Sequence, residues 1–204
     1  MTAAPLSTIA LRALTDAGLI DILHVRGVGD VEAIGRLQTR IEELRGADLL
    51  SLGALADAIR VAEVGPIVRI YAGIDSRPDA FTLRRASSTV AGIDFLRSVA
   101  IARVLRERSA RLRVDWGDIG LELAQVALGF GANELIGPIA DKRGLPIADG
   151  SAKKVKGQGT VSMQLLKRKE LAGLIAIAGR TPMFVDAQDT MQIPVSTQIP
   201  EAIQ

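Results

Sequence analysis

The sequence predicts an α/β protein, folded as a partial (β/α) barrel of about five mostly parallel strands with flanking helices. Short runs rich in Val, Ile and Leu alternate along the 204 residues with longer segments whose apolar residues recur at helical spacing. Such alternation is typical of βα units joined by right-handed crossovers. Aromatic residues make up only 3% of the chain, so the core must be aliphatic. About five strands are too few for a closed barrel, which needs eight.

In the first part of the chain, capping and breaking residues delimit the expected elements. A short helix follows Ser7 and ends at Gly18. The β-branched residues of segment 19–25 then predict a strand. Asp30 is expected to cap a helix over residues 31–45, because Ile34, Leu37, Ile41 and Leu44 form one apolar stripe.

The rest of the chain continues the alternation of helices and strands. A second capped helix is expected over residues 49–63, followed after Gly65-Pro66 by a buried strand over 67–73. Residues 74–90 are predicted to be irregular. The later elements are a helix from Ser88 or Thr89 to Arg106, a strand over 111–116, a helix over 119–130, a strand edge within 132–139, a Gly/Lys-rich loop over 141–160, a helix over 164–178 and a strand over 180–187.

We expect one α/β domain over residues 1–190 and a flexible C-terminal tail over residues 191–204, where Pro and Gln accumulate. The composition also excludes several functional classes. A net charge of +2 is too small to indicate nucleic-acid binding, and no apolar run approaches the roughly 20 residues of a membrane span. Because no cysteine is present, thiolate metal sites and cysteine nucleophiles are excluded. We therefore expect a cytoplasmic protein without a signal peptide, metal or cofactor.

Two segments carry a recognisable pattern. The first reads SVAIARVL, a strand with a Trp, and then LAQVALGFGANELIG; the second reads ELAGLIAIAGRTPMFVD. Together they resemble the C-terminal half of the radical-SAM enzymes of menaquinone biosynthesis (futalosine route) and of deazaflavin cofactor biosynthesis. A fainter similarity extends over residues 11–72.

The departures from this family matter as much as the likeness. Its enzymes carry a CxxxCxxC loop whose thiolates hold a [4Fe–4S] cluster, and this sequence has no cysteine. The resemblance therefore implies a catalytically incomplete homologue that acts as an accessory, regulatory or ligand-binding subunit linked to menaquinone biosynthesis. Two alternatives remain open: a small metal-independent enzyme that uses acid–base residues, and a purely structural interaction protein.

Functional groups of βα proteins collect at the C-terminal ends of the strands. Asn133 and Glu134 lie in the matched motif and are the first candidates to bind a small polar ligand. Asp115 and Glu134 also suit an acid–base pair, Trp116 suits stacking on a planar ligand, and His24 suits a general base. The remaining candidates at the expected strand ends are Tyr71 and Asp75. For each of them, a structural role such as packing or capping is an equally simple interpretation.

Lys153, Lys154 and Lys156 lie among glycines and are candidates for anion binding, although the same composition also fits a solvated loop without a ligand. Five arginines at 103, 106, 108, 111 and 113 are expected on a solvated surface. An open partial barrel leaves two sheet edges, which proteins cover or pair. We therefore expect a homo-oligomer, or a partner chain that supplies the missing half of the barrel.

Overall fold

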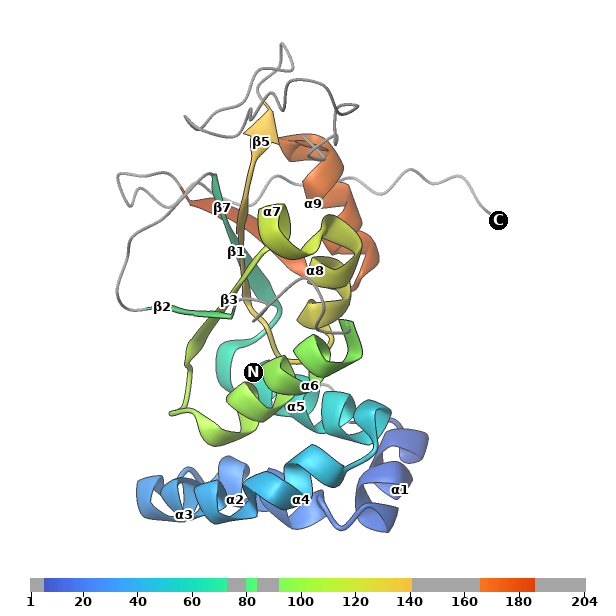
Figure 1. Cartoon of the computed structure of the whole chain (residues 1–204), viewed down its shortest axis with the longest axis vertical. Helices are drawn as coiled ribbons and strands as arrows, with labels where there is room; N and C mark the ends of the chain where they lie inside the picture. Colours follow the sequence, from blue (N-terminus) through green and yellow to red (C-terminus); the bar gives the residue numbers. More distant parts are fainter. Residues whose placement is uncertain (1–5, 73–79, 84–91, 141–165, 186–204) are drawn as a thin grey trace, which may run out of the picture.

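The computed structural model describes residues 6–72, 80–83, 92–140 and 166–185, and shows helices packed on parallel strands (Figure 1). The helices are α1 (Thr8–Asp16), α2 (Ile20–Val28), α3 (Val31–Arg36), the 3₁₀ helix η1 (Leu37–Arg40), α4 (Ile41–Gly46), α5 (Leu49–Val64), α6 (Gly92–Leu105), α7 (Trp116–Ile119), α8 (Leu121–Leu128) and α9 (Arg168–Ile177). The strands are β1 (Ile67–Ala72), β2 (Ala80–Leu83), β3 (Arg111–Asp115), β4 (Glu134–Gly137), β5 (Ile139–Ala140), β6 (Leu166–Lys167) and β7 (Thr181–Val185).

Five strands form one parallel sheet in the order β2-β3-β4-β1-β7, and β5 pairs with β6 in a small second sheet. The predicted α/β class, with about five parallel strands and flanking helices, is confirmed. β1 precedes β2 in the chain, yet it lies between β4 and β7. This crossover places β1 directly beside the end of the sequence motif that contains β4.

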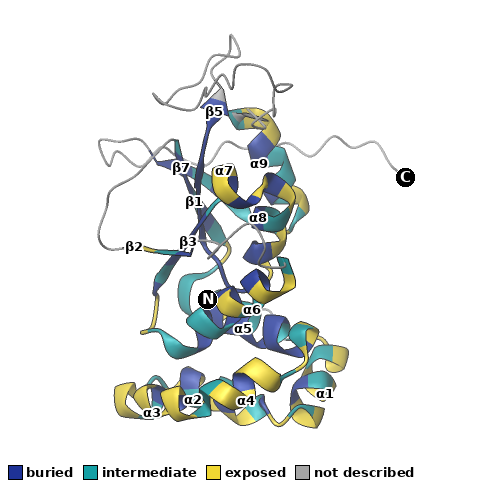
Figure 2. Ribbon diagram, viewed as in Figure 1, coloured by how far each residue is buried: buried dark blue, intermediate teal, exposed yellow. Residues whose placement is uncertain are grey.

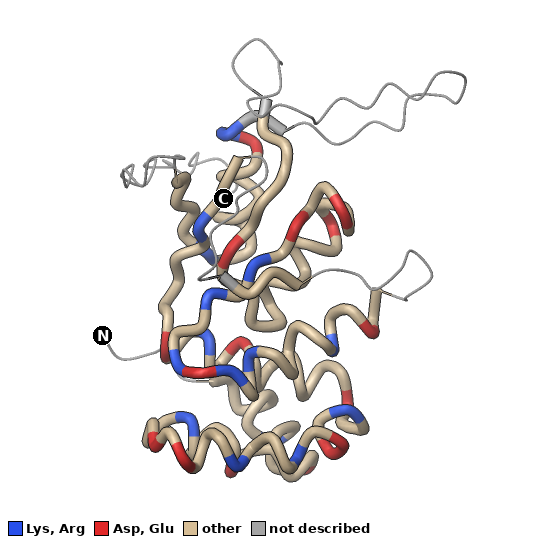
Figure 3. Tube along the Cα trace, turned by 60° about the vertical axis from the view of Figure 1, so that its left-hand side comes forward, with Lys and Arg blue, Asp and Glu red and all other residues tan. Residues whose placement is uncertain are grey.

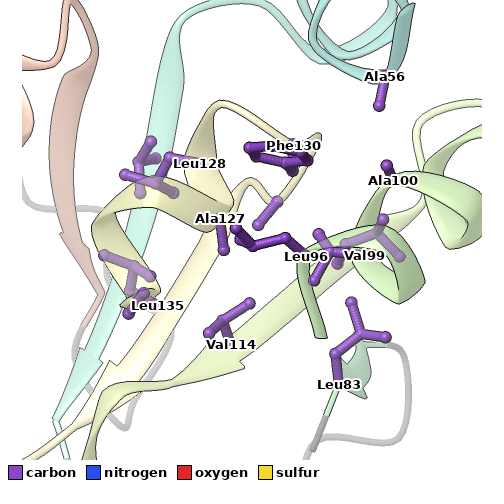
Figure 4. Close-up of a cluster of buried hydrophobic side chains, with 14 of the residues drawn as sticks. Ala56, Leu83, Leu96, Val99, Ala100, Val114, Ala127, Leu128, Phe130 and Leu135 are labelled. Carbon is purple, nitrogen blue, oxygen red and sulfur yellow. The ribbon is translucent and has the colours of Figure 1, made fainter. Parts of the chain in front are cut away.

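One face of the main sheet carries the core. Its inward residues, such as Val68, Leu112, Val114 and Leu135, alternate along their strands with more polar residues. They pack against apolar side chains of α5, α6 and α8, where Phe130 fills the space beside Ala127 and Leu96 (Figure 4). Figure 2 shows buried residues along the strands and on the helix surfaces that face them. The core is almost entirely aliphatic, as the composition predicts.

Helices α1 to α4 gather at one end of the molecule, next to α5 and α6 (Figure 1). Ser7 caps α1, Asp30 caps α3 and Asp48 caps α5, each through a side-chain oxygen that accepts a backbone N–H. Burying Leu14, Ile22 and other apolar residues of these helices attaches the layer to α5. No helix among the described residues is long and apolar enough to cross a membrane.

The predicted strand over residues 19–25 is wrong, because this segment lies in helix α2. Its buried positions are Leu19, Ile22 and Arg26, which are spaced by three and four residues as on a helix face. The segment is rich in Ile, Leu and Val, and a short apolar run of this kind fits either structure. His24 consequently lies on an exposed helix surface rather than at a strand end.

Other differences from the expected elements are local. The helix over 31–45 is divided into α3, η1 and α4, although its stripe of Ile34, Leu37 and Leu44 is buried as expected. Residues 80–83, expected to be irregular, form β2 against β3. The helix over 119–130 is interrupted at Gly120, whose φ of 87° ends α7 before α8 begins. Residues 166–167 form β6, so the last helix begins later than predicted.

Candidate functional site

The second face of the main sheet carries a group of polar side chains on β1, β3 and β4. Arg69 of β1 and Arg113 of β3 are the register partners of Glu134 on β4, one on each side of it. Tyr71 lies two residues after Arg69 on β1, and Arg111 lies two residues before Arg113 on β3. Both side chains therefore point to the same face of the sheet. We call Arg69, Tyr71, Arg111, Arg113 and Glu134 the polar cluster.

Glu134 is the centre of the polar cluster and is fully buried. Arg111 Nε donates to Glu134 Oε1 at 2.5 Å, while Arg113 Nη2 donates to Oε2 at 2.9 Å. The Tyr71 hydroxyl lies 3.3 Å from Oε1 and accepts a hydrogen bond from Arg111 Nη2. The Arg113 guanidinium also lies over the Tyr71 ring, 4.5 Å from its centroid. Both carboxylate oxygens are thus engaged, and Glu134 acts as a fixed counter-charge.

The polar cluster contains three guanidinium groups and a single carboxylate. Arg113 is 1% exposed and Arg111 is a quarter exposed, and both bind Glu134. Arg69 is half-buried, and its side chain has no hydrogen bond or ion pair in the described part of the chain. Figure 3 shows basic residues on strands as well as on the outer helices. Because guanidinium groups match carboxylate and phosphate oxygens in a two-pronged geometry, Arg69 can bind a small anion on this face.

Asn133, the other candidate in the matched motif, is held inside the protein. Its Oδ1 accepts hydrogen bonds from Leu112 N at 2.8 Å and from Arg103 Nη2 at 2.9 Å. Arg103 Nε also donates to Gly131 O, so the pair fixes the turn that leads into β4. Burial lowers the pKa of Arg103 to about 10. The contacts of Asn133 connect α6, β3 and this turn.

Asp115 and Trp116 lie at the end of β3 and position α7. Asp115 Oδ1 accepts a hydrogen bond from Gly117 N at 2.8 Å, which caps the helix. Trp116 is 3% exposed, and a Cβ built on Gly137 would lie only 2.4 Å from its indole ring. The ring therefore lies flat against the backbone of β4, with one face covered by it.

The structure does not bring His24 together with the other candidates. His24 is on α2, at the opposite end of the molecule from the carboxyl ends of β3 and β4 (Figure 1). It lines a shallow hollow with Ile20, Leu23 and other residues of the same helix segment. Asp75, Lys153, Lys154 and Lys156 lie outside the described residues.

The arginines of the polar cluster are functional candidates that sequence reasoning missed. The expectation of a solvated arginine surface is wrong for Arg103 and Arg113, which are buried. A signal was present in the segment Arg111–Asp115, where charged residues alternate with Leu and Val. On a strand, this period of two puts all the charges on one face. The same period relates Arg69 and Tyr71 in β1.

The [4Fe–4S] cluster implied by the family resemblance does not fit this chain. Such a cluster is held by cysteine thiolates, and the sequence contains none. We therefore derive no chemical step through a cluster.

Comparisons with known proteins find two relatives that match about half of the chain. Aminodeoxyfutalosine synthase of Thermus thermophilus is 32% identical over 96 residues, which cover 47% of this chain and 23% of that protein. The 5-amino-6-(D-ribitylamino)uracil–L-tyrosine 4-hydroxyphenyl transferase of Archaeoglobus fulgidus is 34% identical over 101 residues, covering 49% of this chain and 26% of that protein. No family model matches the chain. The chain thus matches about a quarter of the length of these relatives. About half of it resembles a part of the radical-SAM enzymes of the futalosine and deazaflavin pathways, as the sequence motifs predict.

Proposed function

We propose that this protein is a ligand-binding homologue of these radical-SAM enzymes, without its own cluster, and that it binds a small anion at the polar cluster. The ligand is a carboxylate or phosphate compound that occupies the sheet face around Arg69. In this proposal the protein is a cytoplasmic accessory subunit of menaquinone or deazaflavin biosynthesis.

The observation that carries the proposal is the half-buried Arg69 side chain, which has no hydrogen bond or ion pair among the described residues. Arg113 and Arg111 satisfy both oxygens of Glu134, which leaves Arg69 beside a carboxylate that is already occupied. Buried and half-buried positive charge is costly unless it is paired. An anion bound to Arg69 supplies a negative charge that pairs with its guanidinium.

An accessory role is supported by the missing thiolates, because this sequence has no cysteine to hold a cluster. β2 and β7 form the two ends of the strand order, and sheet edges are usually paired or covered. We propose that the chain assembles with a second copy or with a chain that supplies the rest of a barrel. Sedimentation at micromolar concentration should reveal this assembly. A clean monomer that also fails to bind a co-expressed cluster-carrying chain would count against it.

Isothermal titration calorimetry at low ionic strength tests the anion site, with citrate, benzoate and inorganic phosphate as probes. We expect at least one probe to bind with 1:1 stoichiometry. Arg69→Gln removes the guanidinium and should weaken binding about tenfold, the effect of losing one charge-assisted hydrogen bond. The matched control is Arg36→Gln, because Arg36 is an exposed arginine on α3, away from the sheet.

The control separates site binding from general screening of charge. Equal weakening by Arg69→Gln and Arg36→Gln would show that the anions respond only to net charge. If none of the probes binds the unchanged protein, the anion site is wrong, and a purely structural interaction protein becomes the better interpretation.

A further inference from the structure

A cavity separate from the polar cluster lies in the helical layer, on the side of α5 that faces α1 and α2. Its volume is about 910 Å³, within the range of small-molecule sites. Its walls are mostly apolar and include Leu11 of α1, Leu23 of α2, and Ala54 and Ala58 of α5. None of these residues belongs to the polar cluster, so the cavity is independent of the function proposed above.

The charged residues of this cavity leave an excess of positive charge. Arg26 Nη2 binds Glu63 Oε2 at 2.7 Å, and Arg180 Nη2 binds Asp57 Oδ1 at 2.7 Å. Both carboxylates on the wall are therefore paired. Arg108 also lines the cavity and is exposed, and within the described ranges its side chain has no hydrogen bond or ion pair.

Several buried polar groups lie behind the wall of this cavity. Arg26 Nε and Arg180 Nε are both buried and have no acceptor among the residues that the structure describes. Nearby, Arg60 shares Asp57 with Arg180, and its Nη2 also lacks an acceptor. Glu63 Oε1 is buried too and accepts no hydrogen bond among the described residues, so these groups lie behind the cavity wall, and Arg108 is the exposed cation that lines the cavity.

We propose that this cavity binds an amphipathic carboxylate, with its apolar body against α1, α2 and α5 and its carboxylate toward Arg108 and Arg180. The small side chains of Ala54, Ala58 and Gly27 leave the room for the apolar body. The carboxylate supplies the negative charge that Arg108 lacks among the described residues. A neutral apolar molecule supplies neither, so the cavity discriminates against it.

Decanoate is a suitable probe, and decanol is the neutral control. Calorimetry should show 1:1 binding of decanoate with a dissociation constant below about 1 mM, and weaker binding of decanol. Arg108→Gln should weaken decanoate binding about tenfold and leave decanol binding unchanged. Arg36→Gln, again on the exposed surface of α3, is the matched control and should bind decanoate normally.

Filling the cavity gives a test that does not depend on charge. A Cβ added at Gly27 meets no atom within 4 Å, so the backbone position accepts a side chain in Gly27→Leu, and Gly27 lines the cavity. Gly35→Leu is the matched control, because Gly35 also has open space but does not line the cavity. We expect Gly27→Leu to reduce decanoate binding at least tenfold, with an unchanged circular dichroism spectrum.

Three results would overturn the proposal: no decanoate binding by the unchanged protein, equal binding of decanol, or decanoate binding that survives Gly27→Leu and Arg108→Gln together. The last result would place decanoate elsewhere on the protein.

Discussion

Arg113 and Glu134 lie opposite each other on β3 and β4, and the Arg113 Nη2 and Glu134 Oε2 atoms are 2.9 Å apart. Both side chains are almost completely removed from solvent, at 1% and 0% exposed. Guanidinium and carboxylate therefore depend on each other for charge compensation. This pair fixes the geometry of the polar cluster, since Tyr71 and Arg111 bind the same carboxylate.

The first prediction concerns this ion pair. Glu134→Leu should lower the free energy of unfolding by about 3–5 kcal/mol, because it removes the buried carboxylate that binds Arg113 and Arg111. Arg113→Met should also destabilise the protein. The double variant should be more stable than the sum of the single effects indicates, as measured by urea denaturation in a double-mutant cycle. Strictly additive effects would contradict a direct coupling between these residues.

A second prediction concerns Arg26, which connects three helices. It pairs with Glu63 of α5, and its Nη1 donates to the carbonyl oxygens of Val104 and Arg106 at the end of α6. Arg26→Met should therefore lower the free energy of unfolding by about 3–5 kcal/mol.

The matched control is Arg40→Met. Arg40 also binds two carboxylates, Asp21 and Glu43, but these partners are exposed. Exposed ion pairs contribute about 1 kcal/mol or less. Chemical denaturation should thus separate the two variants clearly, and similar losses for both would mean that burial of Arg26 has no energetic role.

The third prediction compares two glycines in helices. A Cβ on Gly53 of α5 would lie 2.7 Å from the Phe130 ring, whereas a Cβ on Gly35 of α3 meets nothing within 4 Å. Gly53→Ala should destabilise the protein by about 1–3 kcal/mol through overpacking. Gly35→Ala should stabilise it by up to about 1 kcal/mol, because alanine is the better helix former. Thermal denaturation of the two variants measures both signs, and stabilisation by Gly53→Ala would show that Phe130 has room to move.

Local signals were sufficient for elements whose ends are marked by caps and breakers. Asp48 and the pair Gly65-Pro66 delimit α5, and the apolar run that follows forms β1. Segment 19–25 lies between Gly18 and Gly27, but these breakers fit the ends of a strand as well as those of a helix, and the composition of the segment suits either. β2 is only four residues long and exists through its pairing with β3, which no local pattern encodes.

The polar cluster could be predicted only in part. Glu134 and Tyr71 were candidates, but Arg69 was not considered and Arg113 was assigned to the surface. Arginine is normally exposed, and the burial of Arg113 depends on Glu134, which is 21 residues away in the chain. The contact between β1 and β4 spans more than 60 residues and follows from the crossover in the sheet. Such partners are known only once the strand order is known.

The last prediction concerns the acid stability of α5. The Asp48 carboxylate accepts hydrogen bonds from the backbone N–H of Ser51 at 2.9 Å and from the Ser51 hydroxyl at 3.0 Å, and these bonds lower the pKa of Asp48. A carboxylate with a lowered pKa in the folded state stabilises the protein above its ordinary pKa, and this contribution disappears as the pH falls through the folded-state value.

Asp48→Asn can still cap the helix but does not titrate. The difference in Tm between the unchanged protein and Asp48→Asn should therefore be positive at pH 7 and shrink below about pH 4. Because all other carboxylates titrate equally in both proteins, a difference that stays constant on acidification would mean that the cap does not depend on the charge of Asp48.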